Sequence, residues 1–69
     1  MPWGMSEERF VEQLVTQWPR VLKQHGLPEN IALDSVGLDT VGDGRYAVTS
    51  GTGPLRDKNG NPVVITVSP

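Results

Sequence analysis

Residues 6–25, which read SEERFVEQLVTQWPRVLKQH, determine the architecture of this 69-residue chain. Their apolar side chains recur at the three- and four-residue spacing of an α-helix and lie on one arc of roughly 140°. The opposite side of the arc is polar. This pattern predicts an amphipathic helix over residues 6–25 that covers one face of a sheet. Its apolar residues are Phe10, Val11, Leu14, Val15, Trp18, Val21 and Leu22.

Both ends of the predicted helix carry boundary signals. Ser6 is a good N-cap, and Met5 and Phe10 have the spacing of a hydrophobic staple across the first turn. Gly26 suits the left-handed position that closes a Schellman motif, and Pro28 prevents the helix from continuing. The helix is therefore expected to end just before Gly26.

Pro19 stands inside this pattern, where it removes one main-chain hydrogen bond and clashes with the preceding turn. The apolar spacing nevertheless continues through it. We expect one kinked helix with Pro19 on the solvent side. The alternative is a break into two short helices, with Pro19 in the first position of the second.

The rest of the chain predicts an antiparallel sheet of three to four short strands over residues 31–67. The first hairpin turns around Asp43, and a three-residue loop with Gly44 in a left-handed bulge produces one coherent apolar face. A two-residue turn would divide that face between the two sides of the sheet. The residues that the longer loop brings together are Val36, Leu38, Tyr46 and Val48.

A second hairpin is centred on Asn59 and Gly60, the pair that a type I′ turn prefers. Residues 55–57 are expected to form a short strand before it. Residues 63–67 are nearly all apolar and β-branched, which is typical of the most buried strand. We therefore expect this last strand at the centre of the sheet.

Together these elements predict one α+β domain over residues 1–69, in the order α-β-β-(β)-β. A leader at 1–5 precedes the helix at 6–25 and the sheet at 31–67. A chain of this size buries only roughly 60% of its unfolded surface, so its stability is marginal. Length alone thus favours binding to another protein or self-association.

Composition and motifs exclude several functional classes. The chain has no cysteine, which excludes disulfides and thiolate metal sites. It shows neither a signal peptide nor the roughly 18 apolar residues of a membrane span, so we expect a cytoplasmic protein without membrane contact. His25 is the single histidine and is expected to cap the helix carbonyls. No spacing matches a metal, phosphate-binding or catalytic motif, so we expect no cofactor and no enzymatic activity.

Charge is distributed unevenly. Eight acidic and six basic residues give a net charge of −2, and residues 29–44 contain four carboxylates without a Lys or Arg. Acidic residues in turns and on strand rims support local hydrogen bonding and solubility. Alternatively, Asp34, Asp39 and Asp43 form a surface for a basic partner protein. The basic residues are scattered, which argues against direct binding of nucleic acid.

The two tryptophans have different expected roles. Trp18 lies at the centre of the apolar arc and is predicted to be core. Trp3 lies in the leader, outside the helix. It either closes over an end of the sheet or anchors an interface, where aromatic residues contribute much of the binding energy.

The leading hypothesis is therefore a small acidic, non-catalytic protein-interaction module that binds and blocks or adapts a larger partner. A phage-encoded inhibitor of nucleic-acid-handling or defence machinery would belong to this class. The alternative is a structural or assembly subunit that forms homodimers or larger assemblies through its sheet edge. That alternative rests on Val41 and on the β-branched terminal strand.

Overall fold

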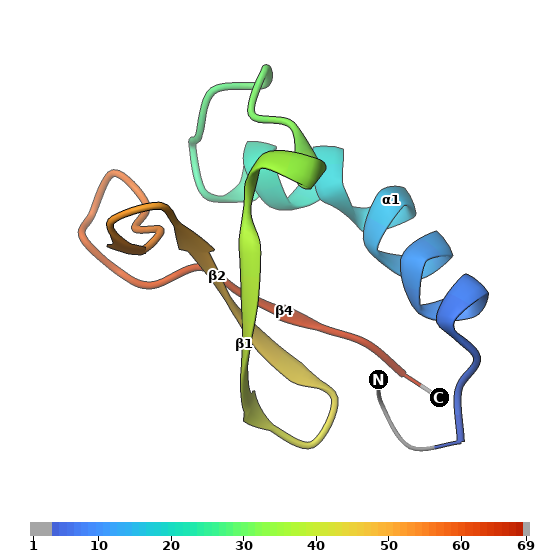
Figure 1. Ribbon diagram of the computed structural model, residues 1–69. Helices are drawn as coiled ribbons and strands as arrows, with labels where there is room; N and C mark the ends of the chain where they lie inside the picture. Colours follow the sequence, from blue (N-terminus) through green and yellow to red (C-terminus); the bar gives the residue numbers. More distant parts are fainter. Residues whose placement is uncertain (1–3, 69) are drawn as a thin grey trace.

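The computed structural model describes residues 4–68 and has one helix packed on one antiparallel sheet, which confirms the predicted α+β fold (Figure 1). The helix covers one face of the sheet, and the other face is open to solvent. The elements follow in the order α1 (Glu7–Gln24), the 3₁₀ turn η1 (Leu33–Ser35), β1 (Gly37–Gly42), β2 (Arg45–Ser50), β3 (Gly53–Pro54) and β4 (Val64–Thr66).

The signals at both ends of α1 act as predicted. The hydroxyl oxygen of Ser6 accepts a hydrogen bond from the main-chain N–H of Arg9 at 3.2 Å. At the other end, the N–H of Leu27 donates to the carbonyl oxygen of Leu22 at 2.9 Å, which is the outer bond of a Schellman motif. Gly26 has the left-handed φ of 65° that this motif requires. The predicted ends are confirmed to within one residue.

Pro19 lies inside α1, which continues through it as one helix. The alternative of two separate helices is therefore wrong. Pro19 is exposed to solvent, and the helix axis changes direction near its middle in Figure 1. A proline on the outer side of a bend leaves the buried side of the helix continuous.

The buried side of α1 is narrower than predicted. Val11 and Val15 are 47% and 57% exposed, so the prediction that they belong to the buried side is wrong. The helix is turned so that the other margin of its apolar arc, with Gln13 and Gln17, lies over the last strand. The sheet is too narrow to cover both margins. The residues of α1 that are buried are Leu14, Trp18, Val21 and Leu22.

β1 and β2 form the first predicted hairpin. Gly44 at its tip has a φ of 67°, the predicted left-handed conformation, and the register shifts directly after Thr40. Leu38 consequently stands opposite Val48, and Thr40 stands opposite Tyr46. The predicted apolar face is therefore formed. Its members Val36, Leu38, Tyr46 and Val48 are buried or half-buried in the core beneath α1.

The central strand is β2, and the prediction that residues 63–67 lie at the centre is wrong. β1 pairs with one edge of β2, while β4 and β3 pair one after the other along its second edge. In the last strand Ile65 is buried, whereas its neighbour Val64 is 41% exposed. Because one helix covers only one face of the sheet, even an apolar strand exposes alternate residues.

The second turn is not of type I′. Gly60 has a φ of 82°, but no residue other than glycine among residues 4–68 has a positive φ, and a type I′ turn needs two. The cause is local, because the carboxylate of Asp57 accepts hydrogen bonds from the N–H groups of Asn59 and Asn61 at 2.9 and 3.0 Å. The strand expected at 55–57 is reduced to one isolated bridge.

Trp18 is confirmed as a core residue. It is 7% exposed, and its indole N–H donates to the carbonyl oxygen of Ile31 at 2.7 Å. The rings of Phe10 and Tyr46 meet edge to face with centroids 5.3 Å apart, which joins α1 to the central strand. Trp3 lies outside the described residues, so its role stays a prediction.

Candidate interaction surface

The direction of the hydrogen bonds in β2 determines which groups point out of the sheet. Val48 donates its N–H to Val63 and accepts from the N–H of Leu55, each at 2.9 Å, so its main chain faces away from β1. Hydrogen-bonding direction alternates along an antiparallel strand. Leu38 stands opposite Val48, and Thr40 lies two residues farther along β1. Both therefore turn their main-chain groups away from β2.

The outer edge of β1 is open. Among residues 4–68 no strand pairs with that side of β1. Leu38 and Thr40 thus present two N–H donors and two carbonyl acceptors to solvent. The strand is six residues long, and most of its residues are exposed. Such an edge is a template on which another extended chain can form hydrogen bonds.

The end of the outer edge of β4 is covered by side chains of α1. Gln17 donates its amide N–H to the carbonyl oxygen of Thr66 at 3.0 Å. Gln13 bonds both main-chain groups of Ser68: its amide nitrogen donates to the carbonyl oxygen, and its amide oxygen accepts from the N–H at 3.0 Å. Residues 66–68 accordingly lie beside the first turns of α1 (Figure 1). Two glutamine amides here take the place of a neighbouring strand at Thr66 and Ser68.

Sequence reasoning missed this role of the glutamines. Gln13 and Gln17 are four residues apart and lie at the margin of the apolar arc, a position that faces the rim of whatever the helix covers. That spacing is a usable signal for polar contacts at a helix margin. It does not identify the strand contacted, because the placement of β4 depends on its pairing with β2.

The three predicted acidic residues lie along β1. Asp39 is exposed within the strand, opposite Ala47, on the face of the sheet away from α1. Asp34 lies in η1 just before β1, and Asp43 lies in the turn just after it. Six strand residues span roughly 20 Å, so the carboxylates are spaced out and form no single cluster. We call β1 with Asp34, Asp39 and Asp43 the acidic edge.

The charges of the acidic edge are directed to solvent. The one ion pair among residues 4–68 joins His25 to Asp57, so the three carboxylates of the acidic edge have no ion-pair partner there. Arg45 is the nearest cation in sequence, and its side chain lies beside Gly42, where an added Cβ would be 3.1 Å from Nε. The edge therefore retains a negative field toward an approaching partner.

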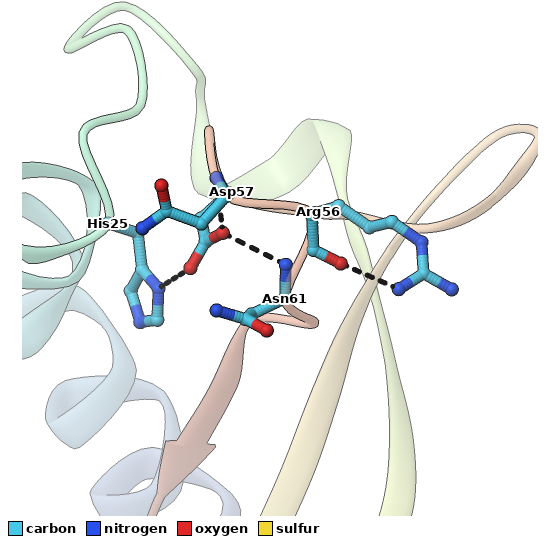
Figure 2. A network of polar contacts seen from close by, with 6 residues as sticks. His25, Arg56, Asp57 and Asn61 are labelled. Atoms are coloured by element: carbon cyan, nitrogen blue, oxygen red, sulfur yellow. Dashed lines mark hydrogen bonds and ion pairs between the residues drawn. The ribbon is translucent and has the colours of Figure 1, made fainter.

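A second polar group lies at the C-terminal end of α1 (Figure 2). The ring nitrogen Nδ1 of His25 is 3.4 Å from Oδ2 of Asp57, and the other carboxylate oxygen, Oδ1, accepts hydrogen bonds from the N–H groups of Asn59 and Asn61. His25 is the C-cap residue of α1, and its main-chain N–H donates to the carbonyl oxygen of Val21 at 3.1 Å. Its side chain contacts Asp57 instead of helix carbonyls, because the loop at 57–61 folds back onto the helix end. This group ties the second hairpin to α1.

The environment of Asp57 favours its ionised form. The hydrogen bond from the main-chain N–H of Asn61 is the main reason that the pKa of Asp57 lies below its ordinary value. Loss of water around the carboxylate opposes this effect. His25 and the N–H of Asn59 lower the pKa further. These partners are a turn and a helix end, so the carboxylate has a structural role.

Two open hollows of about 420 and 410 Å³ lie beside α1, the first over Gln13, Gln17 and Thr66 and the second over Trp18 and Pro19. Within residues 4–68, no group of three or more His, Asp or Glu side chains could hold a metal ion. No helix in that range is long and apolar enough to cross a membrane.

No known protein family matches this chain, and neither a curated protein nor a solved structure does. The feature that distinguishes this surface is therefore the open edge of β1, in contrast to the edge of β4 that side chains of α1 cover at its end.

Proposed function

We propose that this chain is a small non-catalytic protein-interaction module that binds an extended segment of a partner protein along β1. The observation that carries this proposal is the outward main chain of Leu38 and Thr40, which no other strand among residues 4–68 pairs with. In strand addition, main-chain hydrogen bonds supply affinity and alternate side chains supply specificity. The acidic edge adds attraction for a basic partner.

The biological setting proposed for this module follows from its charge. Basic extended segments are frequent in proteins that handle nucleic acid, because they neutralise phosphates. A module that occupies such a segment would block nucleic-acid binding, which makes an inhibitor of nucleic-acid-handling or defence machinery, of the kind that phages encode, the proposed role. The cytoplasm is the proposed compartment.

The test compares how well the parent protein and two variants at Thr40 retain the partner protein. Thr40→Pro removes one outward N–H from β1, an edge position at which proline is tolerated. Thr40→Ala keeps that N–H and is the matched control. We expect the parent and Thr40→Ala to retain the same stoichiometric partner and Thr40→Pro to lose it, with circular dichroism showing all three folded. Equal capture by the folded Thr40→Pro variant would contradict binding at β1.

The carboxylates of the acidic edge are tested in the captured complex. Changing Asp34, Asp39 and Asp43 to Asn should slow association and weaken its dependence on salt, because rim charges act mainly on the encounter. The melting temperature should stay nearly constant. Asp43→Asn alone controls for a contribution of this side chain to its own turn. An unaltered association rate and salt slope would show that these carboxylates are ordinary solvated surface.

A second candidate function is an assembly subunit that pairs β1 with β1 of another copy, since the same open edge favours it. A two-fold pairing of Leu38 with Thr40 of the other copy would place two Asp39 carboxylates directly opposite each other. Other registers run into η1 or into the irregularity after Thr40. Repulsion between the two Asp39 carboxylates thus favours a different protein as the partner. Sedimentation separates the two functions, because a monomer supports the interaction module and a dimer supports the assembly subunit.

A further inference from the structure

We infer that the segment accepted by β1 alternates basic and apolar residues, with a Lys or Arg opposite Asp39 and an apolar residue opposite Leu38. This inference rests on the proposed function and specifies the chemistry of the partner. It follows from the positions of these side chains relative to the two faces of the sheet.

The basic position follows from hydrogen-bond geometry. An antiparallel strand added to β1 would form its hydrogen-bonded pairs at Leu38 and Thr40. The residue between those pairs stands opposite Asp39, in the non-hydrogen-bonded pair where side chains approach most closely. Asp39 is exposed and has no ion-pair partner within residues 4–68. A Lys or Arg is the side chain that such a carboxylate favours across a strand pair.

The apolar position follows from the half-buried residues at the margin of the core, beside β1. Leu33, Val36 and Leu38 are half-buried and pack against the buried cluster beneath α1. A residue opposite Leu38 on an added strand would lie on the same face and extend that apolar row. Burial of apolar area there stabilises the complex in proportion to the area removed from water. A polar residue at this position would lose that contribution.

The alternation extends toward both ends of β1. Side chains change face at every residue, so the neighbours two positions from the central basic residue share its face. These two residues of the added strand would stand opposite Gly37 and Val41. The position of Gly37 has no room for a side chain, because a Cβ there would lie 2.6 Å from the hydroxyl oxygen of Thr49. Long basic side chains can therefore cross this region and approach Asp34 and Asp43 at the ends.

The experiment uses the full chain and three acetylated, amidated peptides of sequence TKVKVKT, TQVQVQT and TEVEVET. Binding is measured by titration, and its location by hydrogen exchange at the amides of Leu38 and Thr40. We expect TKVKVKT to slow exchange at both amides and to bind about fivefold more tightly than TQVQVQT, with TEVEVET weakest. The advantage of TKVKVKT should shrink in high salt.

A charge exchange sharpens the result. Asp39→Lys should reverse the order, so that TEVEVET binds better than TKVKVKT. Glu12→Lys, an equal charge change on the exposed side of α1, should leave the order unchanged. Melting curves confirm that both variants are folded. Reversal by both variants would indicate net charge and overturn the assignment to Asp39.

The outcomes distinguish failure of the inferred peptide chemistry from failure of strand addition at β1. Protection of Leu38 and Thr40 by all three peptides with equal affinity would overturn the inferred alternation of charge and leave strand addition standing. Absence of protection by any peptide would overturn strand addition at β1 and the proposed function with it. A dimer that protects these amides without peptide would assign the edge to a second copy and also overturn the inference.

Discussion

At the end of β4, Gln17 bonds the carbonyl oxygen of Thr66 and Gln13 bonds both main-chain groups of Ser68. In contrast, β1 runs for six residues, and no strand among residues 4–68 pairs with the outward main chain of Leu38 and Thr40. Both are edge strands on the same central strand. The difference arises because a single helix can reach only one margin of the sheet. An exposed edge strand can pair with other chains, and most proteins cover or blunt such edges. The open edge of β1 is therefore the basis of the proposed binding function.

The two edges also differ in charge. Neutral amides bond the β4 edge at Thr66 and Ser68, while the β1 edge carries carboxylates before, within and after the strand. Acidic side chains on an open edge oppose self-pairing and still permit pairing with a basic chain. Under the proposed function, this charge would make the open edge select basic extended segments, although its main chain could pair with any extended chain.

The largest change in the difference between the two edges is expected from Trp18→Ala. It removes the buried side chain that anchors α1 to the carbonyl of Ile31, at a cost of about 3 to 5 kcal/mol, comparable to the whole stability of a small domain. Without a seated helix, β4 loses its cover and both edges become open. Thermal melting checks this outcome. A variant that melts within a few degrees of the parent would show that the helix is held elsewhere.

The next effect is expected from Gln13→Ala combined with Gln17→Ala. The double variant removes three hydrogen bonds to Thr66 and Ser68, each contributing about 0.5 to 1.5 kcal/mol, and their exposure limits the total to about 2 kcal/mol. Urea unfolding measures the loss, and hydrogen exchange at the Ser68 amide should accelerate. Gln24→Ala is the matched control on the exposed last turn. Unchanged exchange at Ser68 would contradict closure of this edge.

A smaller effect is expected from Asp39→Thr, which removes the charge but keeps a residue suited to strands. Relief of the repulsion between two copies should raise the dimerisation constant by up to about fivefold, as sedimentation over a concentration series can show. Asp39→Glu preserves the charge and serves as the control. Identical self-association of the two variants would mean that this carboxylate does not oppose pairing of β1 with itself.

The smallest effect concerns acid stability at the helix end. Because the folded pKa of Asp57 is below its unfolded value, the carboxylate contributes stability that is present above about pH 4 and lost as pH falls through the folded pKa. Asp57→Asn should flatten this part of the stability profile, measured by urea unfolding between about pH 2 and 5. An unchanged slope would assign the acid dependence to other carboxylates.

Features that depend on neighbouring residues were predictable from the sequence. Ser6 and Gly26 mark the two ends of the helix, where the capping hydrogen bonds join residues at most five positions apart. Gly44 takes its left-handed conformation within a single turn. The apolar face of the first hairpin followed from the register that this turn imposes. Asn59 and Gly60 are the exception, because the carboxylate of Asp57 competes for the same N–H groups.

The acidic edge was predictable in part. The absence of Lys and Arg from residues 29–44 identified Asp34, Asp39 and Asp43 as candidates. Their spread along β1, and the open main chain between them, could not be read from charge. Both depend on which side of β2 each strand pairs with, and the β-branched run at 63–67 suggested a central place that β2 occupies instead.

By itself, the amino-acid sequence determined the helix with its caps, the first hairpin with its turn, and the sign of the charge along β1, because periodicity and local hydrogen bonds act over a few residues. Only the tertiary structure decided that Gln13 and Gln17 cover β4 and that β1 stays open. Those outcomes join residues up to 55 positions apart, as between Gln13 and Ser68. Such distant contacts depend on how the helix is seated on the sheet, and the seating is a property of the whole core.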